Sequence, residues 1–182
     1  MMPDLYRNDL PAPVYVEKPL QVEWAAPTDW RPPSERGGVD EPTQVQKIGL
    51  RFEQKVSEHI KKQFPHSYDL QKPIQYRAHG DEFDSYCIPD ALIYNQYRKT
   101  CLVVEIKWRH NLAAYNQLRC RYQPIVRRLM YKHSFVKRVK VVEVCRHYQH
   151  DLCVPEDPNF VSGLLQVIDS THDHYNVWVW ND

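Results

Sequence analysis

Apolar side chains recur every three to four positions from residue 45 to residue 64, a spacing that predicts an amphipathic helix. Thr43, just before this stretch, is a favourable N-cap, and Pro65, just after it, ends the helix. The helix should bury a single stripe against the rest of the domain. That stripe consists of Val45, Ile48, Phe52, Val56, Ile60 and Phe64.

A second stretch with helical spacing follows Asn111, which is itself a candidate N-cap. Pro124 lies within this stretch. Because proline has no N–H to donate to the preceding turn, we expect a kink or a break there. The positions that define the helical spacing are Leu112, Tyr115, Arg119, Tyr122, Val126 and Leu129.

Four further segments are rich in β-branched and aromatic residues and predict strands. The overall order is helix, three strands, helix, strand, with a short helix and a last strand added near the C-terminus. A single helix between the third and fourth strands predicts a parallel crossover, so the expected fold class is α/β with a mixed sheet flanked by helices. The four strand segments are 68–78 (an edge strand, because it contains Pro73), 85–95, 100–108 and 138–148.

The strand at 100–108 carries two charged residues directly after an apolar run. Glu105 and Lys107 lie on the same face of this strand, because side chains alternate along it. A carboxylate and an ammonium group there are costly unless they are paired or bound to something. Asp90, in the preceding predicted strand, can bring a second carboxylate to the same end. The pattern predicts a site for a hard divalent cation, with a structural salt bridge as the alternative.

The net charge of +1 hides a strong asymmetry along the chain. From Arg98 to Lys140 there are twelve Lys or Arg residues and one acid, whereas the residues after 140 carry seven acids and one base. A basic block beside carboxylates suits a polyanion, because phosphate contacts dominate nucleic-acid affinity. A solvated helix face is the alternative. The candidate phosphate contacts are Arg109, Arg119, Arg121, Arg127 and Arg128.

The first 42 residues contain eight of the fourteen prolines, which predicts an extended arm. Aromatic residues such as Trp24 and Trp30 could anchor this arm on the chain's own core or on a partner. We therefore expect an arm at 1–42 and one domain at 43–182, with a core at 43–148 and a C-terminal extension at 149–182.

Other features of the chain bear on its location. It has no run of eighteen apolar residues and no basic-then-apolar leader, so we expect no membrane association. Its five cysteines have no CxxC spacing and predict free thiols in a reducing compartment.

Pro89-Asp90 followed by Glu105-x-Lys107, within this order of elements, resembles the PD-(D/E)xK nuclease superfamily, especially its Holliday-junction-resolvase-like and phage nuclease members. The resemblance covers roughly residues 43–148 and implies a restriction-endonuclease-like core. It implies that Asp90 and Glu105 bind Mg²⁺ (or Mn²⁺) and that Lys107 assists the attacking water. Resolvase-like members carry another glutamate on the first helix, a place that Glu53 matches; a solvent-exposed helix acid is the alternative.

Gln117 resembles a glutamine that some branches of the superfamily carry on the second helix. The RecB-related and phage exonuclease branch would have a tyrosine four positions later. Here Arg121 occupies that position, and Tyr122 comes one residue late. This departure argues against the exonuclease branch and leaves the role of Gln117 open.

Taken with these patterns, the resemblance implies a magnesium-dependent DNA endonuclease that acts in phage DNA processing, packaging or head completion, or in repair and recombination. The expected partners are DNA and, through the arm, a homodimer or a larger assembly. The expected location is the cytoplasm or a virion. Two alternatives stay open: a structural component of a phage-like assembly that retains the nuclease fold, and a DNA-binding module without catalysis.

Overall fold

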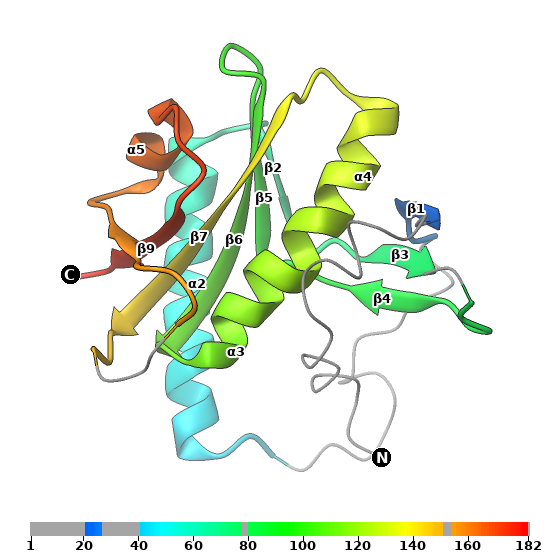
Figure 1. The fold of residues 1–182 in the computed structure, drawn as a ribbon. Coiled ribbons are helices and arrows are strands. Elements are labelled where there is room, and N and C mark those ends of the chain that lie inside the picture. The colour runs from blue at the N-terminus through cyan, green and yellow to red at the C-terminus, as the bar shows by residue number, and fades with distance from the viewer. Residues whose placement is uncertain (1–20, 27–40, 78–79, 151–153, 182) are drawn as a thin grey trace.

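The computed structural model describes residues 21–26, 41–77, 80–150 and 154–181. A six-stranded sheet lies at its centre, in the order β2-β5-β6-β7-β9-β8, and helices cover both faces (Figure 1). This confirms the predicted α/β class with helices on a central sheet. The strands are β2 (Tyr68–Leu70), β5 (Ala91–Asn95), β6 (Thr100–Arg109), β7 (Arg138–His147), β8 (Asn159–Phe160) and β9 (Tyr175–Val179).

The pairing of these strands is mixed, as the sequence predicts. β5 runs antiparallel to both of its neighbours, β2 and β6, whereas β6, β7, β9 and β8 run parallel to one another. The helical segment between β6 and β7 is therefore a parallel crossover. The C-terminal extension contributes β9 and β8, which complete one side of the sheet.

The first predicted helix is α2 (Gln44–Gln63), and its cap is the predicted one. Thr43 accepts a hydrogen bond from the backbone of Gln46, whose side chain bonds back to the backbone of Thr43. The inner residues of α2, which include Phe52, pack against the apolar face of β5, β6 and β7. Val45 is 71% exposed, so its predicted burial is wrong. The reason is geometric: the first turns of α2 extend past the end of the sheet (Figure 1).

The opposite face of the sheet is covered by one continuous helical segment with three parts. These are α3 (Leu112–Tyr115), a π-helix η3 (Asn116–Tyr122) and α4 (Gln123–His133). Asn111 caps the first part by accepting a hydrogen bond from Ala114 N. The predicted irregularity near Pro124 takes the form of the wider π-turn, in which Gln123 N donates to Leu118 O, five residues back.

Two of the predicted strands are each broken at a proline, which corrects the sequence prediction. The segment 68–78 divides at Pro73 into β2 and β3 (Ile74–Arg77), and 85–95 divides at Pro89-Asp90 into β4 (Ser85–Cys87) and β5. β3 and β4 leave the main sheet and form a second, three-stranded sheet with β1 (Gln21–Trp24).

Part of the arm is thereby tied to the domain itself. β1 pairs with β3, and Val22 is buried in the core under the α3–η3–α4 layer. Residues 1–20 and 27–40 of the arm, which include Trp30, lie outside the described residues. Within the described part of the chain, no helix is both long and apolar enough to cross a bilayer.

Lys140 is a buried cation with a structural partner. It is 2% exposed and donates from Nζ to Val167 O at 2.8 Å and to Ile168 O at 3.2 Å, with a further bond to Ser170 O. These carbonyls lie at the C-terminus of α5 (Leu164–Asp169), where a cation is favourable. Lys140 therefore joins β7 to the helix beneath it.

We expect Lys140→Met to lower the free energy of unfolding by about 2 kcal/mol, because it leaves buried carbonyls without a donor. Urea denaturation checks this. Lys137→Met, at an exposed position just before the same strand, is the matched control and should leave stability unchanged. Equal stability of the two variants would contradict the structural role of Lys140.

Candidate functional site

Asp90 lies in the bend directly before β5, where it meets the C-terminal half of β6. The antiparallel register places Ala91 opposite Val104, so Asp90 comes next to Glu105. Its Oδ2 accepts a hydrogen bond from the backbone N–H of Ile106 at 2.6 Å. Because the strand is broken at Pro89, Asp90 lies outside β5. The hydrogen bond from Ile106 holds its carboxylate against β6.

Glu105 and Lys107 form an ion pair on β6. Lys107 Nζ lies 2.6 Å from Glu105 Oε1. Glu105 is only 3% exposed, and its other oxygen, Oε2, is buried without a hydrogen-bond partner. A buried carboxylate oxygen with no donor is unfavourable. The predicted ion pair is therefore present, but it engages only Oε1 and leaves Oε2 without a hydrogen-bond donor.

Glu53 approaches the same place from α2. It is half-buried, and burial together with the negative charge of Asp90 raises its pKa from about 4.5 to about 7, while Lys107 acts in the opposite direction. Burial also raises the pKa of Glu105, to which the charges of Asp90 and Glu53 contribute. Glu53 and Glu105 both respond to the charge of Asp90, and Glu105 also responds to Glu53, so the structure brings the sequence-predicted carboxylates near one another.

The donor set fits a hard divalent cation in its chemistry. Glu53, Asp90 and Glu105 offer carboxylate oxygens, the ligands that Mg²⁺ and Mn²⁺ prefer, and Glu105 Oε2 is a buried acceptor without a partner. Among the described residues, however, no three His, Cys, Asp or Glu side chains are already arranged as a metal-ligand group. Lys107 holds the neighbouring oxygen of Glu105 in this arrangement.

The π-helix changes the interpretation of Gln117 and Tyr122. In a π-helix the residue five positions along is the neighbour on the same face, as the fourth is in an α-helix. Both side chains are buried. Tyr122 is close enough to Glu105 and Asp90 for both to raise its pKa, after the larger effect of burial. The late tyrosine is thus on the side of the helix that faces the carboxylates.

Gln117 itself is not seen to bond to the carboxylates. Its Oε1 is buried without a hydrogen-bond partner. The structure places it in the layer over β6 and β7, and its accessory role stays a prediction.

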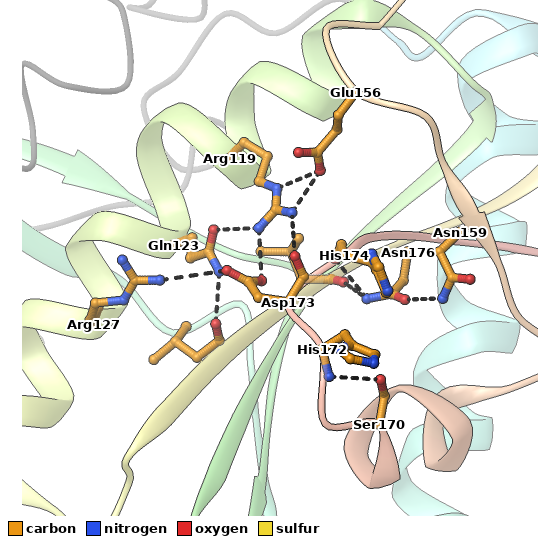
Figure 2. A network of polar contacts seen from close by, with 12 residues as sticks. Arg119, Gln123, Arg127, Glu156, Asn159, Ser170, His172, Asp173, His174 and Asn176 are labelled. Carbon is orange, nitrogen blue, oxygen red and sulfur yellow. Dashed lines mark hydrogen bonds and ion pairs between the residues drawn. The ribbon is translucent and has the colours of Figure 1, made fainter.

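The predicted phosphate contacts divide into two groups. Arg109, Arg127 and Arg128 are exposed, although Arg127 also lies 4.0 Å from a carboxylate oxygen of Asp173. Arg119 is instead held by Glu156 at 2.6 Å and by Asp173 at 2.8 Å (Figure 2).

Arg121 is also engaged within the protein. It donates to Tyr86 O and lies over the ring of Tyr76. Through its contacts with Arg119, the acidic C-terminal segment neutralises part of the basic block. With Arg121 also engaged, fewer arginines are available to phosphates than the sequence predicts.

A second buried polar group was missed by the sequence analysis. Glu143 is fully buried on β7, in register with Glu105 on β6. It accepts hydrogen bonds from the hydroxyl of Tyr175 and is 2.8 Å from His110 Nδ1. The signal was available, since Glu143 interrupts a β-branched run as Glu105 does.

Comparison of the chain with protein-family models, curated proteins and solved structures gives no match. The case for a function therefore depends on the chemistry of the site itself.

The raised pKa of Glu53 predicts a pH dependence of stability without added metal. Between its usual pKa of 4.5 and its folded pKa of about 7, the folded protein retains a proton that the unfolded chain has lost. Raising the pH through this window therefore lowers the free energy of unfolding. Urea denaturation in EDTA should show this decline.

Glu53→Gln should make the decline shallower, because the amide does not titrate. Glu58→Gln, at an exposed position of the same helix, is the control and should retain it. An unchanged slope in Glu53→Gln would contradict the burial of an ionisable Glu53 beside Asp90.

Proposed function

We propose that this protein is a divalent-cation-dependent nuclease of PD-(D/E)xK type that hydrolyses phosphodiester bonds in DNA. The observation that carries the proposal is the convergence of Glu53, Asp90, Glu105 and Lys107 from α2, the start of β5 and the end of β6. Groups that perturb one another's pKa at the end of a sheet are typical of catalytic sites.

The order of elements supports a restriction-endonuclease-like core. α2, β2, β5, β6, the α3–η3–α4 segment and β7 follow one another in the order that the resemblance implies. β3 and β4 are inserted between the first and second strands of that core. They carry no member of the proposed site.

Each site residue has a role that follows from its position. Asp90 and Glu105 would hold the cation from two adjacent strands, and Glu53 would add a carboxylate from the helix. A bound Mg²⁺ supplies positive charge that polarises the phosphodiester and lowers the pKa of a bound water. Lys107 would stabilise the negative charge that develops on the phosphate, because its ammonium already lies at the carboxylates.

Gln117 and Tyr122 are proposed as accessory residues on the helix above the site. The hydroxyl of Tyr122 donates a long hydrogen bond to Ile88 O at 3.4 Å, and burial raises its pKa further above neutral pH, so it stays protonated. A Gln-Tyr pair of this kind also makes DNA ends candidate substrates, besides internal bonds. Arg109 and Arg128 are the proposed phosphate contacts, since both are exposed, and Arg127 would join them by exchanging its long ion pair with Asp173 for a phosphate.

The test is incubation of the purified protein with supercoiled, linear and branched DNA, in Mg²⁺, in Mn²⁺ and in EDTA. We expect cleavage of at least one substrate with a divalent cation and none in EDTA. Nicking of the supercoiled form identifies an endonuclease, and shortening of the linear form alone identifies an exonuclease. Binding in EDTA without cleavage under any condition would contradict the proposal and favour a non-catalytic DNA-binding module.

A further inference from the structure

An aromatic cluster lies at the same end of the sheet as the carboxylates, on the other face of β6. Trp108 follows Lys107 directly in β6 and therefore points to the α2 side. Its ring packs edge-on against Phe52 at 5.7 Å and against His147 at 4.9 Å. The site and the cluster are thus separated only by the thickness of one strand.

Two further tryptophans extend this cluster towards β9. Trp178 and Trp180 have ring centroids 4.7 Å apart, and His59 of α2 lies 5.5 Å and 5.0 Å from them. We call Trp108, Trp178, Trp180 and His59 the tryptophan patch. All four are partly exposed, although the core beneath them is closed.

Partial exposure of three of the chain's five tryptophans leaves large apolar rings in contact with water. The charges around the patch are predominantly positive. Arg51 and Lys55 are exposed on α2, and Arg146 of β7 donates to Trp180 O at 2.9 Å. The acids on this part of α2 are Glu53, which responds to the charge of Asp90 in the carboxylate site, and Glu58, which accepts a hydrogen bond from Gln54.

Aromatic rings framed by cations match the chemistry of an unpaired nucleic-acid strand, whose bases stack on rings while its phosphates meet Arg and Lys. In a duplex the base faces are hidden by their neighbours and cannot stack in this way. The patch also lies at the carboxyl ends of the parallel strands, where α/β sheets bind ligands.

We propose that the tryptophan patch binds the bases of a single-stranded DNA segment next to the cleavage site. The protein would then prefer DNA with an unpaired strand, such as a flap, a frayed end or a branched structure, over intact duplex. This inference rests on the proposed nuclease function, because it assigns the bound strand to the cleavage site. Its test measures binding alone, so single-strand binding and DNA cleavage can each fail without the other.

The test is a fluorescence titration of the full-length protein in EDTA, where no cleavage can occur. Three probes of about 12 nucleotides are compared: a thymidine oligomer, an abasic oligomer with the same phosphates, and a blunt duplex. We expect the thymidine oligomer to quench tryptophan emission and to bind at least about tenfold more tightly than the abasic oligomer and the duplex. No variant is needed for this comparison, so it does not depend on a mutant that folds.

A substitution within the patch then tests whether the thymidine oligomer binds there. Trp180→Leu should weaken the thymidine oligomer about tenfold and leave the abasic oligomer unchanged. Trp24→Leu is the matched control, because Trp24 lies on β1 beneath the ammonium of Lys72 and outside the patch. Circular dichroism confirms that both variants fold.

Three results would overturn the inference. The abasic oligomer could bind as tightly as the thymidine oligomer, the duplex could bind as tightly as either, or the emission could remain unquenched at saturation. The last result would indicate that another part of the chain covers the patch. In each case DNA cleavage with Mg²⁺ would remain an independent observation.

Discussion

The Glu105→Gln variant is expected to lose at least about 100-fold of the metal-dependent cleavage rate, a loss comparable to the removal of one group that stabilises charge in a transition state. The amide removes a charged ligand and keeps the size of the side chain. Asp90→Asn should cause a similar loss for the same reason. Initial rates on the best DNA substrate, at saturating Mg²⁺, measure the effect.

Lys107→Met separates catalysis from metal binding. This variant should also lose at least about 100-fold in rate, because no ammonium is left to stabilise charge on the phosphate. It should bind the cation at least as well as the wild type, since a competing positive charge beside Glu105 is gone. Full activity of Lys107→Met, or loss of cation binding, would contradict the assigned role.

A matched control keeps this test specific. Glu58→Gln removes a carboxylate from the exposed side of α2 and should leave the rate unchanged. Thermal unfolding of every variant shows whether a loss of activity reflects a loss of structure. An equal loss of rate in Glu58→Gln would mean that net charge, and not the site, controls cleavage.

Glu143→Ala is expected to have the largest effect on stability, a loss of about 3–5 kcal/mol of unfolding free energy. The substitution leaves the hydroxyl of Tyr175 and a ring nitrogen of His110 buried without their acceptor. It also leaves a cavity between β7 and the α3–η3–α4 layer that covers this face. Urea denaturation of the wild type and the variant measures the loss.

Glu143→Gln distinguishes hydrogen bonding from packing. The amide oxygen can still accept from Tyr175, so this variant should lose distinctly less stability than Glu143→Ala. Glu58→Ala, which removes an exposed acid, should change stability little. If Glu143→Ala unfolds at the same urea concentration as the wild type, the buried group has no structural role.

The helices were predictable because their signals are local. The periodicity of 43–64 and the caps at Thr43 and Asn111 involve residues within a few positions of each other. Exposure of Val45 was not predictable in this way, because it depends on where the sheet ends beneath α2. Periodicity shows which side of a helix faces the core. It does not show how many turns of that side pack against the sheet.

The ends of the strands, unlike the helices, depend on pairing with distant parts of the chain. The two prolines at 73 and 89 were visible, but the consequence of each depended on which sheet the following residues joined. The break at Pro89 also determines the geometry of the site, since it allows Asp90 to reach the backbone of Ile106. A short motif located Asp90, and only the fold shows how it is held.

Long-range partners account for the remaining differences. The acceptor Glu143 and its donor Tyr175 are far apart in the chain, so a glutamate in an apolar strand does not reveal its partner. The charge asymmetry did contain a clue for Arg119, because the acids that bind it belong to the acidic C-terminal segment. The π-helix depends on the whole segment around Pro124 and was visible only as an expected break.

The convergence of Asp90 and Glu105 on one cation is tested most directly by anomalous scattering from crystals of the wild-type protein soaked with Mn²⁺. We expect the strongest anomalous peak between these two carboxylates, with Glu53 beside it, and no peak there in crystals of Glu105→Gln. A wild-type protein that cleaves DNA but shows its Mn²⁺ elsewhere, or none at saturating concentration, would contradict this account.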